Sequence, residues 1–272
     1  MIGGRPSKVL QRGGLLPWLS SWPSVIKTVS GWPELGSGHG LGREADMRTQ
    51  ERLLVDARRT WKPYRVAYEV IKAMRGLDAG SVVEVITKDD QGLLNDLGVW
   101  CRAAGHELLG DQLGQGQARV LIRKAEPVRN DRTMTVIMST ASLEHAVYPL
   151  DKALAGAVLG MDVAVVFEGA GVRLLQRGYR PRLSGLVGGL FTAKVEGVLK
   201  NEVGWPLPQE SILILEDLGA RFYICSPSMF GYGVREQDLI VSNYTLGAVI
   251  TWADLLARSD IQIFSRAQFD KP

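Results

Sequence analysis

The segment QESILILEDLGARFYICSPS, residues 209–228, decides the fold of the second half of the chain. Its first ten residues predict a helix that ends at Gly219, because glycine readily adopts the left-handed conformation that closes many helices. Arg221 to Cys225 then predict a short strand. Ser226 can cap the next helix, or Pro227 can occupy its first position. A cysteine is therefore expected where a strand ends and a helix begins.

The flanking residues extend this segment into an alternating α/β pattern. Strands are predicted at 134–138, 163–167 and 261–264, with helices running to Gly160 and over 246–257. Strand, helix and strand at this spacing give parallel pairs, so a doubly wound parallel sheet is expected over 133–266. The stretch 169–208 shows no clear period and is expected to be irregular.

The preceding residues predict a smaller unit with the element order βαβαββ, a two-layer α/β sandwich. Its strands are expected at 53–55, 81–87, 106–112 and 118–124, with a helix starting at Pro63 and a second one capped by Asp89 or Asp90. The domain prediction is an irregular, disordered tail over 1–48, a first unit over 49–125, a linker over 126–132 and a second unit over 133–266.

Composition places the chain among ordinary globular proteins. It is 46% hydrophobic and 22% charged with a formal net charge of +3, which argues against disorder and gives no default preference for nucleic acid. The most apolar stretch, 153–166, contains Asp162 and is too short to span a bilayer, so no membrane association is predicted. Two cysteines are too few for a disulfide framework and fit a cytoplasmic protein.

Cys225 is the candidate catalytic residue. At the carboxyl end of a parallel strand it lies where open α/β sheets bind ligands, and a helix start beside it favours the thiolate, the nucleophilic form. The structural alternative is a small apolar residue that closes a core strand. Ser226 and Ser228 are supporting candidates that could donate hydrogen bonds to a persulfide, although helix capping is the simpler account of both.

The other candidate groups are interpreted as structural. Cys101 falls mid-helix on the same face as Leu94 and Leu97, where a thiol behaves as a small hydrophobe. Neither His106 nor His145 has partners at metal-ligand spacing, so neither a metal site nor a cofactor is predicted.

Residues 53–124 resemble the TusA/SirA-like sulfur-carrier family. The resemblance rests on Val55-Asp56-Ala57-Arg58, the helix opening at Pro63, the phrase at 74–80 (MRGLDAG), the phrase at 100–108 (WCRAAGHEL) and the ending at 121–124 (LIRK). It implies a two-layer sandwich that accepts a persulfide on a Cys-Pro motif at the start of the first helix.

This chain departs from that motif at its reactive position. Lys62 stands where the family's cysteine would be, while Pro63 is retained. A cation is also electrostatically unfavourable at a helix N-terminus. The first unit is therefore expected to serve docking or positioning and not to carry sulfur.

Residues 133–265 resemble the DsrE/DsrF-like family. The matching phrases are at 150–154 (LDKAL), 160–163 (GMDV), 218–221 (LGAR), 225–229 (CSPSM) and 259–264 (SDIQIF). Here the family's cysteine position is filled, by Cys225. The resemblance implies sulfur transfer through a cysteine persulfide, exchange with other sulfur-carrier or sulfurtransferase proteins, and homo-oligomers.

Together these observations predict a sulfur-relay protein, a sulfurtransferase or sulfur carrier that uses Cys225 and needs no cofactor. The rival hypothesis is a non-catalytic adaptor or regulator that binds an acidic partner protein or nucleic acid. It rests on the missing cysteine and on a basic group that solvated surface would also explain: Arg48, Arg52, Arg58, Arg59, Lys62 and Arg65.

Overall fold

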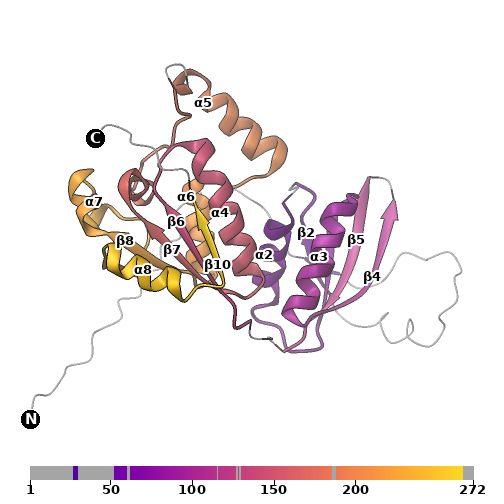
Figure 1. Cartoon of the computed structure of the whole chain (residues 1–272). Coiled ribbons are helices and arrows are strands. Elements are labelled where there is room, and N and C mark those ends of the chain that lie inside the picture. The colour runs from indigo at the N-terminus through magenta and orange to yellow at the C-terminus, as the bar shows by residue number, and fades with distance from the viewer. Residues whose placement is uncertain are drawn as a thin grey trace, which may run out of the picture.

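The computed structural model describes residues 27–29, 52–59, 62–114, 116–126, 128, 130–185 and 188–265. Within them the chain forms two five-stranded sheets, each with its own helices. Figure 1 shows the two sheets side by side, with helices α2 and α4 lying between them. The predicted α/β class is confirmed, including a second sheet that is parallel throughout.

The first sheet has the strand order β1-β2-β3-β5-β4. Strands β2 and β3 pair in parallel, and the other neighbouring strands pair antiparallel. Its elements are β1 (Lys27–Val29), β2 (Arg52–Asp56), α2 (Pro63–Met74), β3 (Val82–Lys88), α3 (Gln91–Ala104), β4 (Glu107–Gly114) and β5 (Gln117–Arg123).

The second sheet has the order β10-β6-β7-β8-β9. Its elements are β6 (Thr133–Met138), α4 (Leu143–Val158), β7 (Asp162–Phe167), the 3₁₀ helix η2 (Gly169–Leu175), α5 (Gly188–Gly197), the π-helix η3 (Val198–Val203), α6 (Pro208–Asp217), β8 (Arg221–Cys225), α7 (Ser226–Gly231), the 3₁₀ helix η4 (Glu236–Asp238), β9 (Tyr244–Gly247), α8 (Val249–Ala257) and β10 (Ile261–Phe264).

Local sequence signals set the element ends that matter most. Asp90 caps α3 by accepting a hydrogen bond from the Leu93 backbone N–H at 2.8 Å. Gly105 closes the same helix with φ of 77°. Gly219, with φ of 86°, follows α6 and turns the chain into β8. These positive φ values are costly for a residue with a Cβ, so the glycines fix where each helix stops.

The second sheet is covered on both faces. Alternate strand residues such as Val136, Val165 and Ile224 face α4 and α6 in the main core. The intervening residues Ile137 and Val166 face Trp252 of α8 in a smaller cluster. Because successive side chains of a strand alternate between faces, each strand residue can be assigned to the α4/α6 side or the α8 side.

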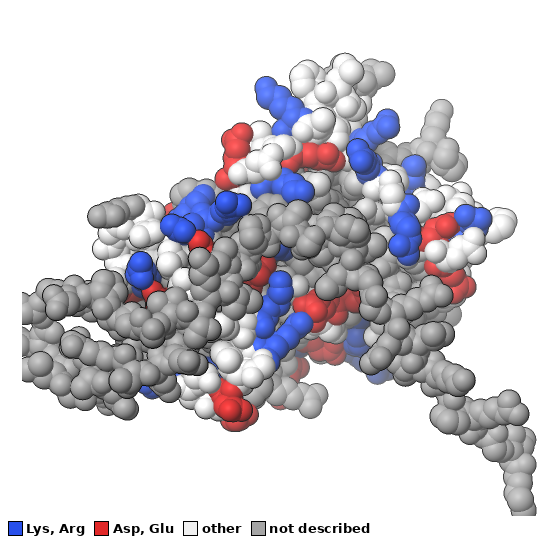
Figure 2. Space-filling view, turned by 180° about the vertical axis from the view of Figure 1, so that it is seen from behind, with Lys and Arg blue, Asp and Glu red and all other residues white. Residues whose placement is uncertain are grey.

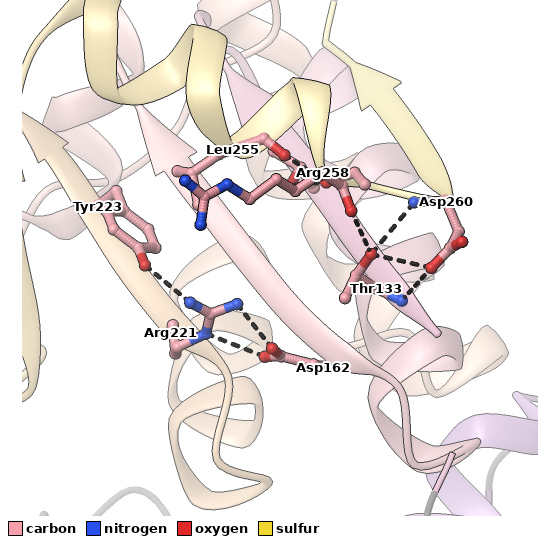
Figure 3. Close-up of polar contacts among 9 residues, drawn as sticks. Thr133, Asp162, Arg221, Tyr223, Leu255, Arg258 and Asp260 are labelled. Carbon is pink, nitrogen blue, oxygen red and sulfur yellow. Dashed lines mark hydrogen bonds and ion pairs between the residues drawn. The ribbon is translucent and has the colours of Figure 1, made fainter. Parts of the chain in front are cut away.

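Polar contacts tie the strands together at their amino-terminal ends (Figure 3). Arg221 at the start of β8 binds the Asp162 carboxylate at the start of β7 through two hydrogen bonds of 2.9 and 2.7 Å, and donates a third one to the Tyr223 hydroxyl. Thr133 at the start of β6 donates its backbone N–H and its hydroxyl to Asp260, next to β10. Cys225 lies at the opposite, carboxyl-terminal end of β8.

Three parts of the chain differ from the expectations. A short strand, β1, forms at 27–29 inside the predicted irregular tail, the rest of which lies outside the described residues; three residues are too few to show a period. The stretch 169–208, expected to be irregular, contains η2, α5 and η3, and α5 exposes Leu190 and Phe191. Strand β9 was not expected, because Leu246 and Gly247 fall within the helix predicted over 246–257, which begins only at Val249.

Gly171 permits a close approach of η2 to the end of β6. A Cβ at this position would lie 1.9 Å from the Met138 carbonyl oxygen, a backbone atom that cannot move aside. We expect Gly171→Ala to lower the free energy of unfolding by about 2 kcal/mol or more. Gly189→Ala is the matched control, since no atom lies within 4 Å of its Cβ position. Urea unfolding of both variants measures the difference, and equal stabilities would contradict the close contact.

Candidate functional site

Cys225 is the last residue of β8 and occupies the N-cap position of α7. Its thiol is free and only partly buried. In the sheet it pairs with Gly247 at the end of β9, and the preceding residue, Ile224, pairs with Phe167, the last residue of β7. The cysteine therefore lies at the carboxyl-terminal edge of a parallel sheet, the edge where such sheets bind ligands. Helix α7 has six residues, so its dipole contribution is smaller than that of a long helix.

The Cys225 side chain packs on the α8 side of the sheet, against the small cluster that contains Trp252. Gly247 lets Trp252 approach, because a Cβ there would lie 3.1 Å from the indole ring. The neighbouring elements carry exposed apolar side chains: Phe230 of α7, Leu246 of β9, and Val249 and Ile250 of α8. The thiol is thus partly sheltered by hydrocarbon, but it is not sealed in a core.

The two supporting serines make structural hydrogen bonds. The Ser226 hydroxyl donates to the Gly247 carbonyl at 3.5 Å, and the Ser228 hydroxyl accepts from the Gly169 backbone N–H at 2.9 Å. These bonds fasten α7 to β9 and to η2. They account for both serines as positioning groups, and the role toward a persulfide stays a prediction.

Glu168 was not singled out from the sequence. The parallel register pairs Phe167 with Ile224, so the next residues along the two strands are Glu168 and Cys225. Glu168 keeps an extended backbone and accepts a 2.9 Å hydrogen bond from the Ser139 hydroxyl at the end of β6. Because strand side chains alternate between faces, Ser139, Glu168 and Cys225 fall on the α8 side of the sheet, in this order across β6, β7 and β8.

Cys101 contrasts with Cys225. It is 1% exposed, in the apolar face of α3. Burial raises the pKa of the Cys101 thiol to about 11, although the nearby Arg102 opposes the shift. Since the thiolate is the reactive form, this thiol is suited to packing and not to sulfur chemistry.

The two described histidines of the folded units have structural partners. The His106 ring packs edge-on against Trp100, and its Nδ1 accepts from the Ala125 backbone N–H. His145 Nδ1 lies 2.9 Å from the Ser142 hydroxyl. Among the residues that the structure describes, no group of three or more His, Cys, Asp or Glu side chains has the arrangement of a metal site.

Lys62 lies at the start of α2 and faces the second unit. Its Nζ atom is 3.7 Å from Asp151 Oδ1 of α4 and 3.3 Å from the centre of the Trp205 ring. The position that the TusA/SirA-like resemblance assigns to a sulfur-carrying cysteine is therefore inside the contact between the two units. It is not on the side of the second sheet where Cys225 packs.

The basic group of the first unit is largely engaged within the chain. Arg58 pairs with Asp56 at 2.6 Å, and Arg65 pairs with Glu69 and with Glu210 of α6. Arg59 is exposed, and the Arg48 and Arg52 side chains lie outside the described residues. Figure 2 shows Lys and Arg interspersed with Asp and Glu over the described residues of one face. This arrangement gives little support to a basic surface for an external acidic partner or nucleic acid.

The described part of the chain contains no helix that combines the length and the apolar character needed to cross a bilayer.

Parts of this chain are similar to known proteins. Over 72 residues, 26% of this chain and 96% of the relative, the chain is 32% identical to an Archaeoglobus fulgidus protein named "Putative sulfur carrier protein". Among solved structures, the ychN protein of E. coli matches with a TM-score of 0.36 and 17% identity, over 50% of this chain and 99% of that one. The family model of the DsrE/DsrF-like family matches residues 132–264. Residues 132–264 of this chain therefore form a DsrE/DsrF-like domain.

Proposed function

We propose that this chain is a sulfur-relay protein that accepts sulfane sulfur as a persulfide on Cys225 and passes it to another thiol carrier. The proposal rests mainly on one observation. Cys225 is a free, partly exposed thiol at the edge of the DsrE/DsrF-like unit where parallel sheets bind ligands, whereas Cys101 is buried. The family match and the likeness to a sulfur carrier both support a sulfur-relay role.

The transfer is an exchange between thiolates. The Cys225 thiolate attacks the outer sulfur of a donor persulfide, a new S–S bond forms to Cys225, and the donor's own S–S bond breaks. The donor leaves as a thiolate and takes up the proton that Cys225 gave away. Sulfur oxidation states balance without an added oxidant or cofactor. A second carrier thiolate then removes the outer sulfur from Cys225 by the same step.

The remaining parts of the chain fit supporting roles. The first unit is proposed to be a TusA/SirA-like module that lacks the carrier cysteine and serves docking. The proposed domain limits are 49–125 and 133–266, with 126–132 between them. The partners are other sulfur-carrier or sulfurtransferase proteins, and the exposed apolar side chains of the elements next to Cys225, such as Phe230 and Ile250, are available for contacts in a homo-oligomer or with such a partner.

Loading with polysulfide tests the proposal. We expect intact-protein mass spectrometry to show the addition of sulfur to the native chain and to Cys101→Ser, and its complete loss in Cys225→Ser. The reason is that Cys225 is the accessible thiol of the two. Reduction should return the loaded protein to its original mass. A Cys225→Ser protein that still takes up reducible sulfur would disprove the assignment, and a native chain that takes up none would disprove the relay.

A further inference from the structure

Lys62 is a poor residue for its local position. It occupies the N-cap of α2, has an extended backbone, and makes no capping hydrogen bond with its side chain. Helix N-termini favour side-chain oxygens and negative charge, so a lysine ammonium is unfavourable there. The reason for a lysine at this point must therefore lie outside α2.

The contact with the second unit supplies that reason. The ammonium lies between the Asp151 carboxylate of α4 and the face of Trp205. The Trp205 ring is itself held edge-on by Tyr148 at 5.2 Å. A cation paired with a carboxylate and stacked on an indole gains more as water is excluded, because both attractions strengthen when desolvated.

The contact is substantially shielded from water. The Lys62 and Asp151 side chains are 19% and 12% exposed. Burial lowers the pKa of Lys62, and the Asp151 charge opposes that shift. Within the second unit, Lys152 lies 3.8 Å from Asp151 Oδ2. From the first unit, Lys62 supplies the charge that pairs with the Asp151 carboxylate across the interface.

Other ion pairs near this contact also join a basic group of the first unit to an acidic group of the second. Arg75 binds the Asp217 carboxylate with two hydrogen bonds of 2.9 Å, and the Tyr68 hydroxyl donates to the same carboxylate at 3.0 Å. Arg65 pairs with Glu210 at 3.5 Å. In each ion pair the basic group comes from α2 or its ends, and the acidic group comes from α4 or α6. An acidic and aromatic surface of the second unit thus receives a basic face of the first.

We propose that the α4/α6 surface around Asp151 and Trp205 is a docking surface whose occupant is the first unit of the same chain, with Lys62 as its anchor. Lys62 stands at the position that would carry sulfur in the first unit. The contact with the second unit of the same chain therefore covers that position. The α4/α6 surface lies on one face of the second sheet, and Cys225 packs on the other. A sulfur carrier in trans therefore reaches Cys225 without competing with the first unit.

This inference rests on the docking role proposed for the first unit. Its test involves no sulfur chemistry, so the docking contact and the Cys225 relay can fail separately.

Lys62→Asp separates an anchor from a local role. Aspartate is a better N-cap than lysine, so a purely local role predicts slower hydrogen exchange in α2. An anchor role predicts the reverse, because the new carboxylate faces Asp151. We expect amide exchange of α2 and α4 in the full chain to accelerate by about tenfold or more, while exchange of α8, on the other face of the sheet, stays unchanged.

Three further variants complete the test. Arg59→Asp is the matched control, since it makes the same charge change at an exposed residue three positions away, and it should leave exchange in α4 unchanged. Combining Lys62→Asp with Asp151→Lys restores an opposite-charge pair and should return exchange to within about threefold of the native rate. If a single variant does not fold, Lys62→Ser is used instead. It removes the charge and supplies a good N-cap, and it should also accelerate amide exchange of α2 and α4. Slower or unaltered exchange in Lys62→Asp or Lys62→Ser, or a double variant no better than the singles, would overturn the proposal.

Discussion

Iodoacetamide is expected to modify Cys225 in the folded protein at least a hundredfold faster than Cys101. Alkylation requires a thiolate that the reagent can reach. Burial raises the pKa of the Cys101 thiol to about 11, so at pH 8 only roughly 0.1% of that thiol is ionised. Cys101 is also 1% exposed, whereas Cys225 is partly exposed, so access adds to the difference. Peptide mass spectrometry over a time course measures both rates in one sample.

The pH dependence of the alkylation rate gives a second check on the difference between Cys225 and Cys101. Burial disfavours the charged form of Cys101, so its alkylation rate should keep rising by about tenfold per pH unit until the pH approaches about 11. Denaturation in urea should remove the difference between the two thiols, and it serves as the control for intrinsic reactivity. Equal rates in the folded protein would remove the basis for treating Cys101 as structural and Cys225 as the working thiol.

Much of the framework was accessible from local sequence signals. Pro63, Asp90, Gly105 and Gly219 mark helix ends by mechanisms that act within a few residues, and all four occupy the predicted kind of position. The position of Cys225 after β8 follows from the same signals. Such features depend on backbone geometry that the residue itself imposes, so a single sequence contains enough information to predict them.

The neighbours of Cys225 could not be obtained in this way. Glu168 and Cys225 each follow a residue of the Phe167–Ile224 pair, in strands separated by more than 50 residues, and no local pattern encodes that register. One signal was present, because Glu168 follows a buried strand and the carboxyl ends of parallel strands meet at one edge. Helix α5 carried no signal of this kind, since exposed Leu190 and Phe191 break the polar and apolar alternation of an ordinary surface helix.

The contact between the two units could not be predicted from the sequence either. Lys62 was identified as electrostatically unfavourable at its helix end, and that judgement holds for α2 alone. Asp151 and Trp205, which compensate the charge, come from parts of the chain about 90 and 140 residues away. A local conflict in the sequence thus marked a tertiary contact, and the partner could be found only in the folded chain.

Trp100→Ala is expected to lower the free energy of unfolding by about 3–5 kcal/mol, because Trp100 packs within the first unit and also contacts the second. The ring is 3% exposed, and its Nε1–H donates a 3.0 Å hydrogen bond to the Val158 carbonyl. Val158 is the last residue of α4, so its carbonyl has no partner within the helix, and the indole of the first unit acts as a cap for a helix of the second. Truncation would leave both a cavity and an unsatisfied carbonyl.

Two matched variants divide this cost into packing and hydrogen bonding. Trp100→Phe keeps most of the buried ring and removes the donor, so it should cost about 1 kcal/mol for the hydrogen bond plus the smaller volume lost. Val99→Ala alters the neighbouring residue, which is 46% exposed, and should cost less than about 0.5 kcal/mol. Urea unfolding of the three variants under identical conditions gives the comparison. If Trp100→Ala is as stable as Val99→Ala, the indole does not join the two units. A Trp100→Phe loss equal to that of Trp100→Ala would assign the effect to the helix cap and not to packing.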